Sequence, residues 1–226
     1  MTYVLSDLHG CDEKYFAMLE KIDLQESGTL YILGDVIDRG PGGVAILQDM
    51  RKRKNVIPFL GNHEDMALPV LRLLLGEGLG ESENIGYAYW ADWRANGGEP
   101  TRYAFQQLSP EEREETIAYI KSFRLHEEIT VAGRRFHLSH TLPDREQWQT
   151  GERNKEDFIW GEPDYELCYD PDLTFITGHT PTAFIDPAFR GRIWQKNGHI
   201  ALDCGAVFDG GNLGCICLDT MEEFYV

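Results

Sequence analysis

Residues 29–40 read TLYILGDVIDRG, and this stretch shows how the chain is organised. A β-prone run comes first, and Asp35, Asp38 and Arg39 follow it directly. A strand that runs into a charged loop is typical of a sheet edge with a functional site, because rigid strands hold such loops in place. The stretch therefore predicts a strand whose carboxyl end presents charged side chains.

The same pattern occurs on both sides of this stretch. Residues 2–5 run into SDLHG at 6–10, and residues 55–60 run into GNHE at 61–64. Apolar residues at helical spacing separate the three strands, at about 12–21 and 43–54. A β-α-β-α-β order predicts an open, partly parallel sheet, and the loops beyond the carboxyl ends of its strands build the site.

In the second half of the chain the hydrophobic pattern alternates, which indicates strands. A hairpin over 129–139 is expected to end at His140, and a strand over 173–177 is expected to end just before His179. The tail from His199 onward is predicted to form further antiparallel strands. The predicted fold class is therefore α/β (α+β), with two packed mixed β-sheets flanked by helices.

Residues 64–125 read as mostly helical and polar, with a glycine-rich break at 76–86. Ser109 before Pro110 and two acids is a helix start, since Ser caps the helix and Pro suits its first position. We interpret this segment as a small helical cap beside the site. The length is enough for one large core but cramped for two, so a single domain is predicted over 1–226 with a cap insertion at about 64–125.

The chain is strongly acidic, with a formal net charge of −17. This charge disfavours nucleic acid and anionic lipid as partners, because like charges repel at long range. No apolar run approaches the roughly 20 residues that cross a bilayer and no export signal is visible, which predicts no membrane partner and a cytoplasmic location. The cysteines fit reduced thiols, and Cys215 and Cys217 are expected to pack on one face of a strand rather than bind a soft metal.

Each of these motifs is weak alone, because Asp and His are common in loops as caps and as hydrogen-bonded core residues. Five of them at successive strand ends would require several independent accidents. In order, DLHG at 7–10, GDVIDRG at 34–40 and GNHE at 61–64 resemble the signature of the PPP-type, calcineurin-like metallophosphoesterases. SHT at 139–141 and GHT at 178–180 are similar to two later histidine motifs of that family.

The segment WRANGG at 93–98 is similar to an insertion in the bacterial branch of the family, which includes small serine/threonine protein phosphatases. The family also includes symmetrical dinucleoside tetraphosphatases. The resemblance spans nearly the whole chain. It implies a calcineurin-like metallophosphoesterase fold and a hydrolase.

The resemblance also implies two divalent metal ions that share the carboxylate of Asp35. The implied ligands are Asp7, His9 and Asp35 for one ion, and Asp35, Asn62, His140 and His179 for the other. The residue types suit this role independently, because a carboxylate can bridge two cations, imidazole suits Mn, Fe, Zn or Ni, and an amide oxygen suits harder ions. Manganese is the preferred prediction, with Fe, Zn or Ni as alternatives.

Three further residues are implied to take part in catalysis. Arg39 would bind the non-bridging phosphate oxygens as a fork, and His63 would protonate the leaving oxygen. Asp38 would orient His63 and stabilise its charged form. The nucleophile would be a hydroxide activated by the two metal ions, so no serine or cysteine nucleophile is needed.

Two departures from the family pattern leave alternatives open. His140 is followed by Thr-Leu where Ala-Gly is common, and the competing histidine is His137, on the opposite face of the strand. Many members carry a second phosphate-binding arginine shortly after a tryptophan, but no arginine follows Trp160 here. Arg145 or Arg153 could take the place of that arginine. Histidines outside any motif are expected to be structural or at the surface: His126 and His199.

The sequence predicts a metal-dependent phosphoesterase whose partner is a phosphorylated protein or a small phosphate compound. The short chain and the bacterial-type segment favour a serine/threonine protein phosphatase. The alternative is a symmetrical dinucleoside tetraphosphatase or another small-molecule phosphohydrolase. A non-catalytic binding module is disfavoured, because every implied ligand and all three implied catalytic residues are present.

Overall fold

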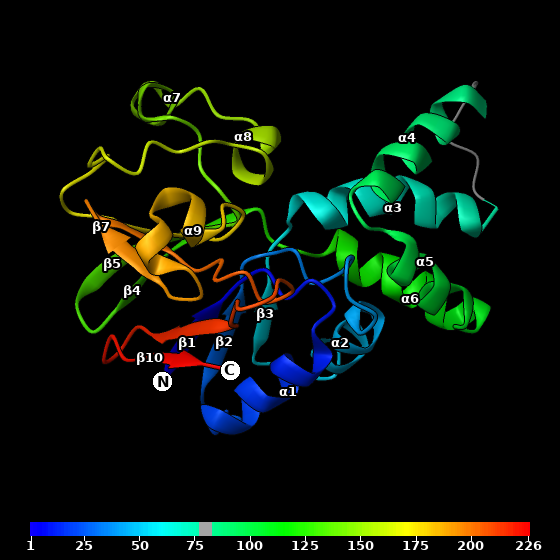
Figure 1. Ribbon diagram of the computed structural model, residues 1–226, viewed down its shortest axis with the longest axis horizontal. Helices are drawn as coiled ribbons and strands as arrows, with labels where there is room; N and C mark the ends of the chain where they lie inside the picture. The colour runs from blue at the N-terminus through cyan, green and yellow to red at the C-terminus, as the bar shows by residue number, and fades with distance from the viewer. Residues whose placement is uncertain (77–82) are drawn as a thin grey trace.

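Two five-stranded β-sheets form the centre of the computed structural model, which describes residues 1–76 and 83–226 (Figure 1). The strand order is β10-β9-β1-β2-β3 in the first sheet and β4-β5-β6-β8-β7 in the second, and both sheets are mixed, which confirms the predicted fold class. The strands are β1 (Thr2–Leu5), β2 (Thr29–Ile32), β3 (Val56–Pro58), β4 (His126–Val131), β5 (Arg134–Ser139), β6 (Thr174–Thr177), β7 (Trp194–Lys196), β8 (His199–Ala201), β9 (Gly214–Cys217) and β10 (Glu223–Tyr225).

The first sheet is buried on both faces, as its apolar strands require. Strands β1, β2 and β3 run parallel, and β9 and β10 add antiparallel strands beside β1. Val4 packs into the core between the sheets, whereas its neighbours Tyr3 and Leu5 pack against the helices. Cys215 and Cys217 also lie on the helix side and are buried, so the prediction that they pack on one face is confirmed.

The second sheet has three parallel strands at its centre, β5, β6 and β8, with β4 and β7 antiparallel at its edges. The predicted hairpin is β4–β5. The prediction that the whole tail is antiparallel is wrong for β8, which pairs in parallel with β6 and brings Ile200 beside Ile176. The crossover from Thr177 to His199 exceeds the dozen residues that a parallel return requires, and the sequence pattern alone does not reveal the direction of that return.

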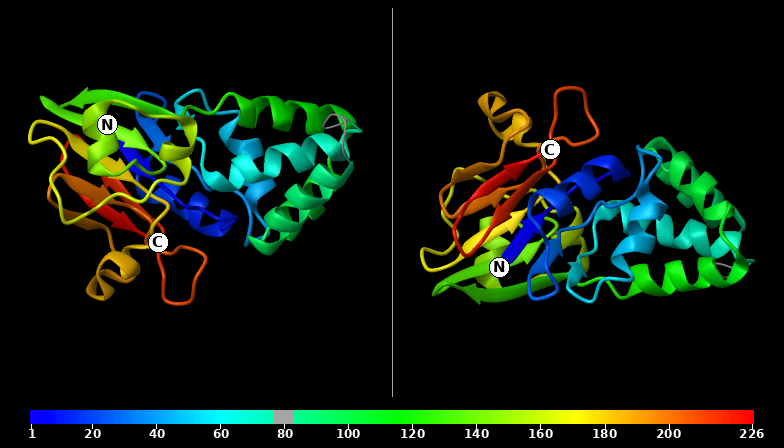
Figure 2. Two further views of the ribbon diagram at one scale, coloured as in Figure 1. Left: turned by 90° about the horizontal axis from the view of Figure 1, so that it is seen from above. Right: turned by 90° about the horizontal axis from the view of Figure 1, so that it is seen from below.

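Helices cover the outer faces of both sheets and extend to one side of them (Figures 1 and 2). Beside the first sheet lie α1 and α2, and α7, α8 and α9 lie beside the second, while α3 to α6 gather at the far end of the molecule. The helices are α1 (Asp12–Lys21), α2 (Gly43–Met50), α3 (Asn62–Leu74), α4 (Glu83–Ala95), α5 (Glu99–Gln106), α6 (Pro110–Lys121), α7 (Arg145–Thr150), α8 (Lys155–Ile159) and α9 (Thr182–Ile185), with a 3-10 turn η1 (Pro187–Phe189).

One local helix prediction is corrected by the structure, and another is confirmed. The helix predicted over 43–54 ends at Met50, after which tight turns take over, such as the one in which the Arg53 N–H donates to Met50 O at 3.0 Å. Helix α6 begins as predicted, with a capping box in which Ser109 and Glu112 bond to each other's backbone N–H.

The segment interpreted as a cap contains α3 to α6, although residues 77–82 of the predicted glycine-rich break lie outside the described residues. Its division from the rest of a single domain stays a prediction. Among the described helices none has the length and apolar character needed to span a bilayer.

Candidate active site

The predicted site residues follow the carboxyl ends of parallel strands, and the structure brings these ends together. Asp7 follows β1, Asp35 follows β2 and Asn62 follows β3, while His140 and His179 follow β5 and β6 of the second sheet. Backbone hydrogen bonds join neighbouring loops: the Asp7 N–H donates to Gly34 O at 3.2 Å, and the Gly178 N–H donates to His140 O at 2.9 Å. The two sheets therefore meet at an edge lined by polar side chains.

The loops that carry these side chains adopt an unusual backbone. In the described part of the chain, six of the ten non-glycine residues with positive φ are predicted site residues: Asp7, His9, Asp35, Asp38, Arg39 and His179. This left-handed conformation costs free energy for residues with a Cβ and persists only where the surroundings impose it. Such a concentration at one sheet edge is typical of a functional site.

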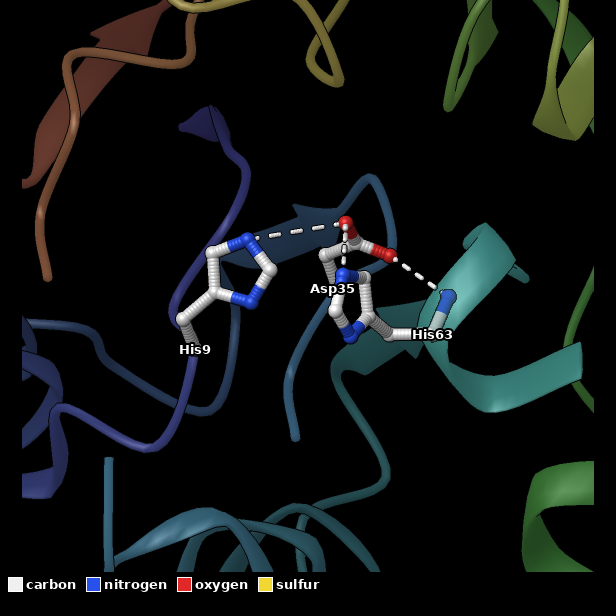
Figure 3. Close-up of side chains that lie close together, drawn as sticks. All are labelled: His9, Asp35 and His63. Carbon is white, nitrogen blue, oxygen red and sulfur yellow. Dashed lines mark hydrogen bonds and ion pairs between the residues drawn. The ribbon is translucent and has the colours of Figure 1, made fainter. Parts of the chain in front are cut away.

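Asp35 lies at the centre of the cluster and is almost fully buried (Figure 3). Its carboxylate is 3.6 Å from His9 Nε2 and 3.9 Å from His63 Nε2 on one side. On the other side it is 3.5 Å from His140 Nε2. Two groups that could hold a metal ion share it, namely His9–Asp35–His63 and Asp35–His140–His179, with ligand atoms within 4.8 Å of one another in each group.

The electrostatics of the cluster favour an ionised Asp35. Burial raises the pKa of this carboxyl, but the nearby His140, His63, His9 and His179 together outweigh burial and lower the pKa below its ordinary value. Burial in turn lowers the pKa of His9 to about 3 and that of His179 to about 4, so both rings are neutral near pH 7. Neutral imidazole beside a carboxylate is the form in which histidine binds metal ions.

Two of these histidines are oriented by backbone carbonyls. His9 Nδ1 lies 3.2 Å from Ile37 O, and His140 Nδ1 lies 2.7 Å from Leu33 O. Because a carbonyl oxygen only accepts, each Nδ1 carries the proton, and each Nε2 turns its lone pair toward Asp35. This second hydrogen bond is what commonly fixes the orientation of a metal-binding histidine.

Lone pairs converge on the side of His140. Its Nε2 is 2.9 Å from Asn62 Oδ1 and 3.1 Å from His179 Nδ1, and Asn62 Oδ1 is also 3.1 Å from His179 Nδ1. With the His140 proton on Nδ1, its Nε2 and the Asn62 and Asp35 oxygens all present lone pairs to one small region. A cation satisfies such a set, so the donor chemistry fits the second metal ion that the sequence predicts.

Asp7 belongs to neither of the two metal-binding groups described above, although it lies on the same edge. Its carboxylate accepts the His179 N–H at 3.0 Å and a short hydrogen bond from the Ser6 hydroxyl. Burial and the nearby carboxylates of Asp203 and Asp35 raise its pKa well above the ordinary value. A Cβ at position 178 would collide with this carboxylate, so only glycine permits the close approach.

His63 forms a hydrogen-bonded array with three buried residues. His63 Nδ1 lies 2.8 Å from Asp38 Oδ2, which also accepts the Trp93 Nε1–H at 2.7 Å. The Thr101 hydroxyl donates to Asp38 Oδ1 at 2.7 Å. Burial alone would lower the pKa of His63, but Asp35 and Asp38 outweigh it and raise the pKa above the ordinary value. The structure thus pairs His63 with Asp38 as the sequence expects, with Nε2 facing the cluster.

Arg39 completes the cluster from the solvent side. Its guanidinium lies 2.7 Å from His9 Nε2 through Nη1 and 3.2 Å from His63 Nε2 through Nη2. The Arg39 N–H donates to Gly97 O at 2.9 Å, which attaches the loop after β2 to the segment at 93–98. A forked cation therefore lies between two histidines of the cluster.

Four further buried residues support the site; sequence reasoning gave no role to three of them, whereas the segment at 203–206 resembles a closing segment near the site in the same family. The Glu64 carboxylate accepts the N–H groups of Gly61, Asp35, Val36 and Ile37, and burial and Asp35 raise its pKa to about 7. Asp203, after β8, has its pKa raised to about 7 by burial and by Asp35. The others are Trp93 and Thr101. Glu64 stands at the third helical position after Gly61, where an acid commonly caps a helix, and this spacing was the available signal.

The alternatives left open by the sequence take other places. Neither ring nitrogen of His137 has a hydrogen-bond partner among the described residues, and the ring packs 4.9 Å from that of Trp148, so His140 is the histidine that faces Asp35. Arg153 stacks on Trp148 at 3.8 Å and donates to its carbonyl. His199 is buried and His126 is exposed, as expected of structural and surface residues.

Comparison with known proteins gives a family match over most of the chain. The profile of the calcineurin-like phosphoesterases matches residues 2–202. A solved structure provisionally assigned as a diadenosine tetraphosphatase is 16% identical with a TM-score of 0.68, covering 100% of this chain and 92% of that one. A protein serine/threonine phosphatase from Saccharomyces cerevisiae is 15% identical with a TM-score of 0.58, covering 95% and 71%. At these identities the two structures show the fold alone.

Curated relatives match over a shorter region. The symmetrical bis(5'-nucleosyl)-tetraphosphatases of Salmonella paratyphi A (strain ATCC 9150 / SARB42) and Salmonella newport (strain SL254) are each 34% identical over 65 residues. This region is 28% of the present chain and 23% of each relative.

Proposed function

Because the chain belongs to the calcineurin-like phosphoesterase family, we propose that it is a metal-dependent hydrolase that cleaves the phosphate chain of a dinucleoside polyphosphate. The observation that carries this proposal is the position of Asp35, whose buried carboxylate is shared by two His/Asp groups. A carboxylate so placed can bridge two cations, which is the arrangement that two-metal hydrolases use.

The residues present fit two divalent ions. In our proposal Asp7, His9 and Asp35 would hold one ion, and Asp35, Asn62, His140 and His179 would hold the other. When bound, such a pair lowers the pKa of water and neutralises phosphate oxygens. The buried carboxyl groups of the cluster support this proposal, because burial and the neighbouring carboxylate of Asp35 raise the pKa values of Asp7 and Asp203, and a cation would offset this negative charge.

The side chains around the ions would divide the remaining work. The Arg39 guanidinium would bind non-bridging oxygens of the phosphate under attack as a fork. His63 would hold a proton on Nε2 and give it to the leaving oxygen as the phosphorus–oxygen bond breaks, which typically contributes ~10²–10⁴-fold to the rate. Asp38, with Trp93 and Thr101, would keep His63 in that orientation.

The substrate class rests on the relatives. The symmetrical tetraphosphatases are 34% identical to this chain over 65 residues, and a structure assigned as a diadenosine tetraphosphatase has a similar fold over the whole chain. The sequence alone favoured a serine/threonine protein phosphatase over a dinucleoside tetraphosphatase. The comparisons support the alternative better, so we place the dinucleoside polyphosphate first.

A serine/threonine protein phosphatase remains the second candidate, and one observation favours it. The segment at 93–98, which is similar to the insertion of that branch, is built into the site: Trp93 donates to Asp38, and Gly97 O accepts the Arg39 N–H. A Cβ at position 98 would collide with the Trp93 ring, which accounts for the second glycine of the segment.

A side-by-side assay separates the two candidates. Diadenosine tetraphosphate and a phosphoserine peptide are offered to the enzyme loaded with Mn²⁺, and parallel assays use Fe²⁺, Zn²⁺ and Ni²⁺. We expect diadenosine tetraphosphate to be the better substrate by kcat/KM and to give ADP as the only nucleotide product. A higher kcat/KM for the peptide would reject the first candidate in favour of the second. No hydrolysis of either compound, together with no metal binding by titration calorimetry, would reject both and leave a binding module.

A further inference from the structure

A cavity of about 310 Å³ lies beside the candidate active site. It opens between α9 and the loop at 205–211, which project next to each other on one side of the molecule (Figure 2). The residues of its lining that matter here are Thr182, Phe184, Arg190, Asp203, Phe208 and Asp209. Its volume is at the lower end of the range found for small-molecule sites.

Two phenylalanine rings of this lining are exposed. Phe184 is 82% exposed and Phe208 is 51% exposed. The Phe184 N–H donates to Pro181 O at 2.7 Å, and the Phe208 N–H donates to Gly205 O at 2.9 Å. Exposed aromatic rings at the mouth of a cavity leave apolar surface in contact with water. A flat apolar group that covers the two rings would remove this apolar surface from water, which is favourable.

The loop that carries Phe208 is preorganised. The Gly205 N–H donates to Asp203 Oδ1 at 2.9 Å, and the Gly211 N–H donates to Phe208 O at 3.0 Å. The Lys14 ammonium donates to the carbonyls of Ala206 and Gly211 at 2.8 and 2.9 Å, which attaches the loop to α1. These contacts fix the backbone of the loop that carries Phe208 beside the cavity.

The cavity adjoins the candidate active site. The Arg39 guanidinium, which contacts His9 and His63, also lies 5.6 Å from the centre of the Phe208 ring. Asp203 lines the cavity and at the same time raises the pKa of Asp7. A ligand in the cavity thus lies next to the arginine that we expect to bind phosphate.

We propose that this cavity, with the rings of Phe184 and Phe208, binds the base of one nucleoside of the substrate. The proposal rests on the proposed function, since a dinucleoside polyphosphate carries a flat aromatic base at a short distance from its phosphates. Bases stack on aromatic side chains, and an arginine next to the stacked base can contact the attached phosphate. The base of a nucleotide thus matches the aromatic rings of the cavity, and its phosphates match the neighbouring Arg39.

The test compares a ligand with a base and a ligand without one. ADP and inorganic pyrophosphate are titrated by calorimetry into the Mn²⁺-loaded wild type and the Phe184→Ala/Phe208→Ala double variant, and KM is measured for diadenosine tetraphosphate. The matched control is Phe16→Ala, because Phe16 is also a partly exposed ring but lies on α1. Both lost rings are exposed, so the double variant should fold, and its thermal midpoint verifies this.

We expect the double variant to raise the Kd for ADP and the KM for diadenosine tetraphosphate by between about 5-fold and 100-fold, because aromatic stacking of a base is lost. Pyrophosphate affinity should stay the same, and Phe16→Ala should behave like the wild type. An unchanged Kd for ADP would overturn the proposal. An equal loss for ADP and pyrophosphate would also overturn it, since the rings would then affect only phosphate binding.

The same titrations distinguish this proposal from the proposed function. If the wild type hydrolyses the phosphoserine peptide and not diadenosine tetraphosphate, the proposed function fails, and the ADP titrations alone decide whether the cavity binds a base. If the double variant instead binds the phosphoserine peptide more weakly and binds ADP with unchanged affinity, the cavity holds a peptide side chain and the proposal is overturned.

Discussion

Buried histidines occur in two regions of this molecule, and the two sets differ in chemistry although they do not differ in burial. His9, His63 and His140 in the candidate site are at most 2% exposed, and so are His137 and His199 on strands β5 and β8 of the second sheet. In the site each ring nitrogen faces a carboxylate, an amide oxygen, another ring or a backbone carbonyl. In the other region the rings mostly face aromatic side chains.

His137 illustrates the second region. Its ring lies 4.9 Å from Trp148, 5.8 Å from Phe175 and 5.9 Å from Phe158, measured between ring centres. Burial and the nearby His126 and Arg153 lower its pKa to about 3, so it is neutral near pH 7. It packs as a flat, nearly apolar ring.

His63 shows what a carboxylate changes. Burial acts on His63 as it does on His137, yet Asp35 and Asp38 raise its pKa above the ordinary value instead. The comparison teaches that burial does not identify a functional histidine. A functional histidine is identified instead by its partner, namely a carboxylate that stabilises the charged ring or supplies negative charge for a metal ion.

The strongest challenge to this comparison is Asp35→Asn, which removes the charge shared by both histidine groups. We expect a loss of kcat/KM greater than the ~10²–10⁴-fold that loss of a general acid costs, together with loss of bound metal. Steady-state assays and the metal content after dialysis measure the two effects. Asp49→Asn on α2 is the matched control and should keep both. Retention of two bound ions by Asp35→Asn would contradict the shared-carboxylate arrangement.

Next in size is His63→Asn, which removes the predicted proton donor. We expect kcat to fall by ~10²–10⁴-fold while the metal content stays the same. A substrate with a more acidic leaving group should recover part of the rate, because its leaving oxygen needs less protonation. His126→Asn, at an exposed position, serves as the control. Equal losses on substrates with good and poor leaving groups would show that His63 does not donate the proton.

A smaller effect is expected for Trp93→Phe, which removes one of the hydrogen bonds that hold Asp38. Loss of a hydrogen bond to a charged group leads us to expect a decrease in kcat of roughly 10-fold. Without this donor the Asp38 carboxylate carries more negative charge toward His63, so the pKa of His63 rises and the alkaline limb of the kcat–pH profile moves to higher pH. Trp90→Phe is the control. A lower kcat with an unmoved limb would indicate a packing role only.

The smallest effect sharpens the other side of the comparison. The unfolded chain binds a proton at His137 below about pH 6.5, whereas the pKa in the fold is about 3, so this residue stabilises the fold above pH 6.5 and loses that contribution as the pH falls toward 3. When the pH is lowered from 6.5 to 5, the free energy of unfolding of the wild type should therefore decrease by roughly 2 kcal/mol more than that of His137→Phe.

Urea unfolding at the two pH values measures this difference. His126→Phe is the control, since His126 is exposed and stacks on the same cluster at its rim. If His137→Phe and the wild type lose equal unfolding free energy on acidification, His137 is protonated in the fold and the two regions are not chemically distinct.

Much of this molecule is readable from local sequence patterns. The alternation of strands and helices up to residue 64, the hairpin ending at His140 and the helix start at Ser109 depend on neighbouring residues, so the pattern predicts them. The candidate site residues are recognisable for the same reason, since they follow strands within a few positions. Residues such as Trp93 and Thr101 contact the site only through the path of the α4–α5 segment, and no local signal marks their hydrogen bonds to Asp38.

The sequence by itself determined the residue types at the strand ends and hence the chemistry available: carboxylates, imidazoles, an amide and one guanidinium. Only the tertiary structure decided which of them meet. The parallel return of β8, the shared position of Asp35 between two sheets and the separation of His140 from His137 depend on packing between elements distant in the chain. Contacts of that kind arise from the burial of both sheets against each other, which no short window of sequence contains.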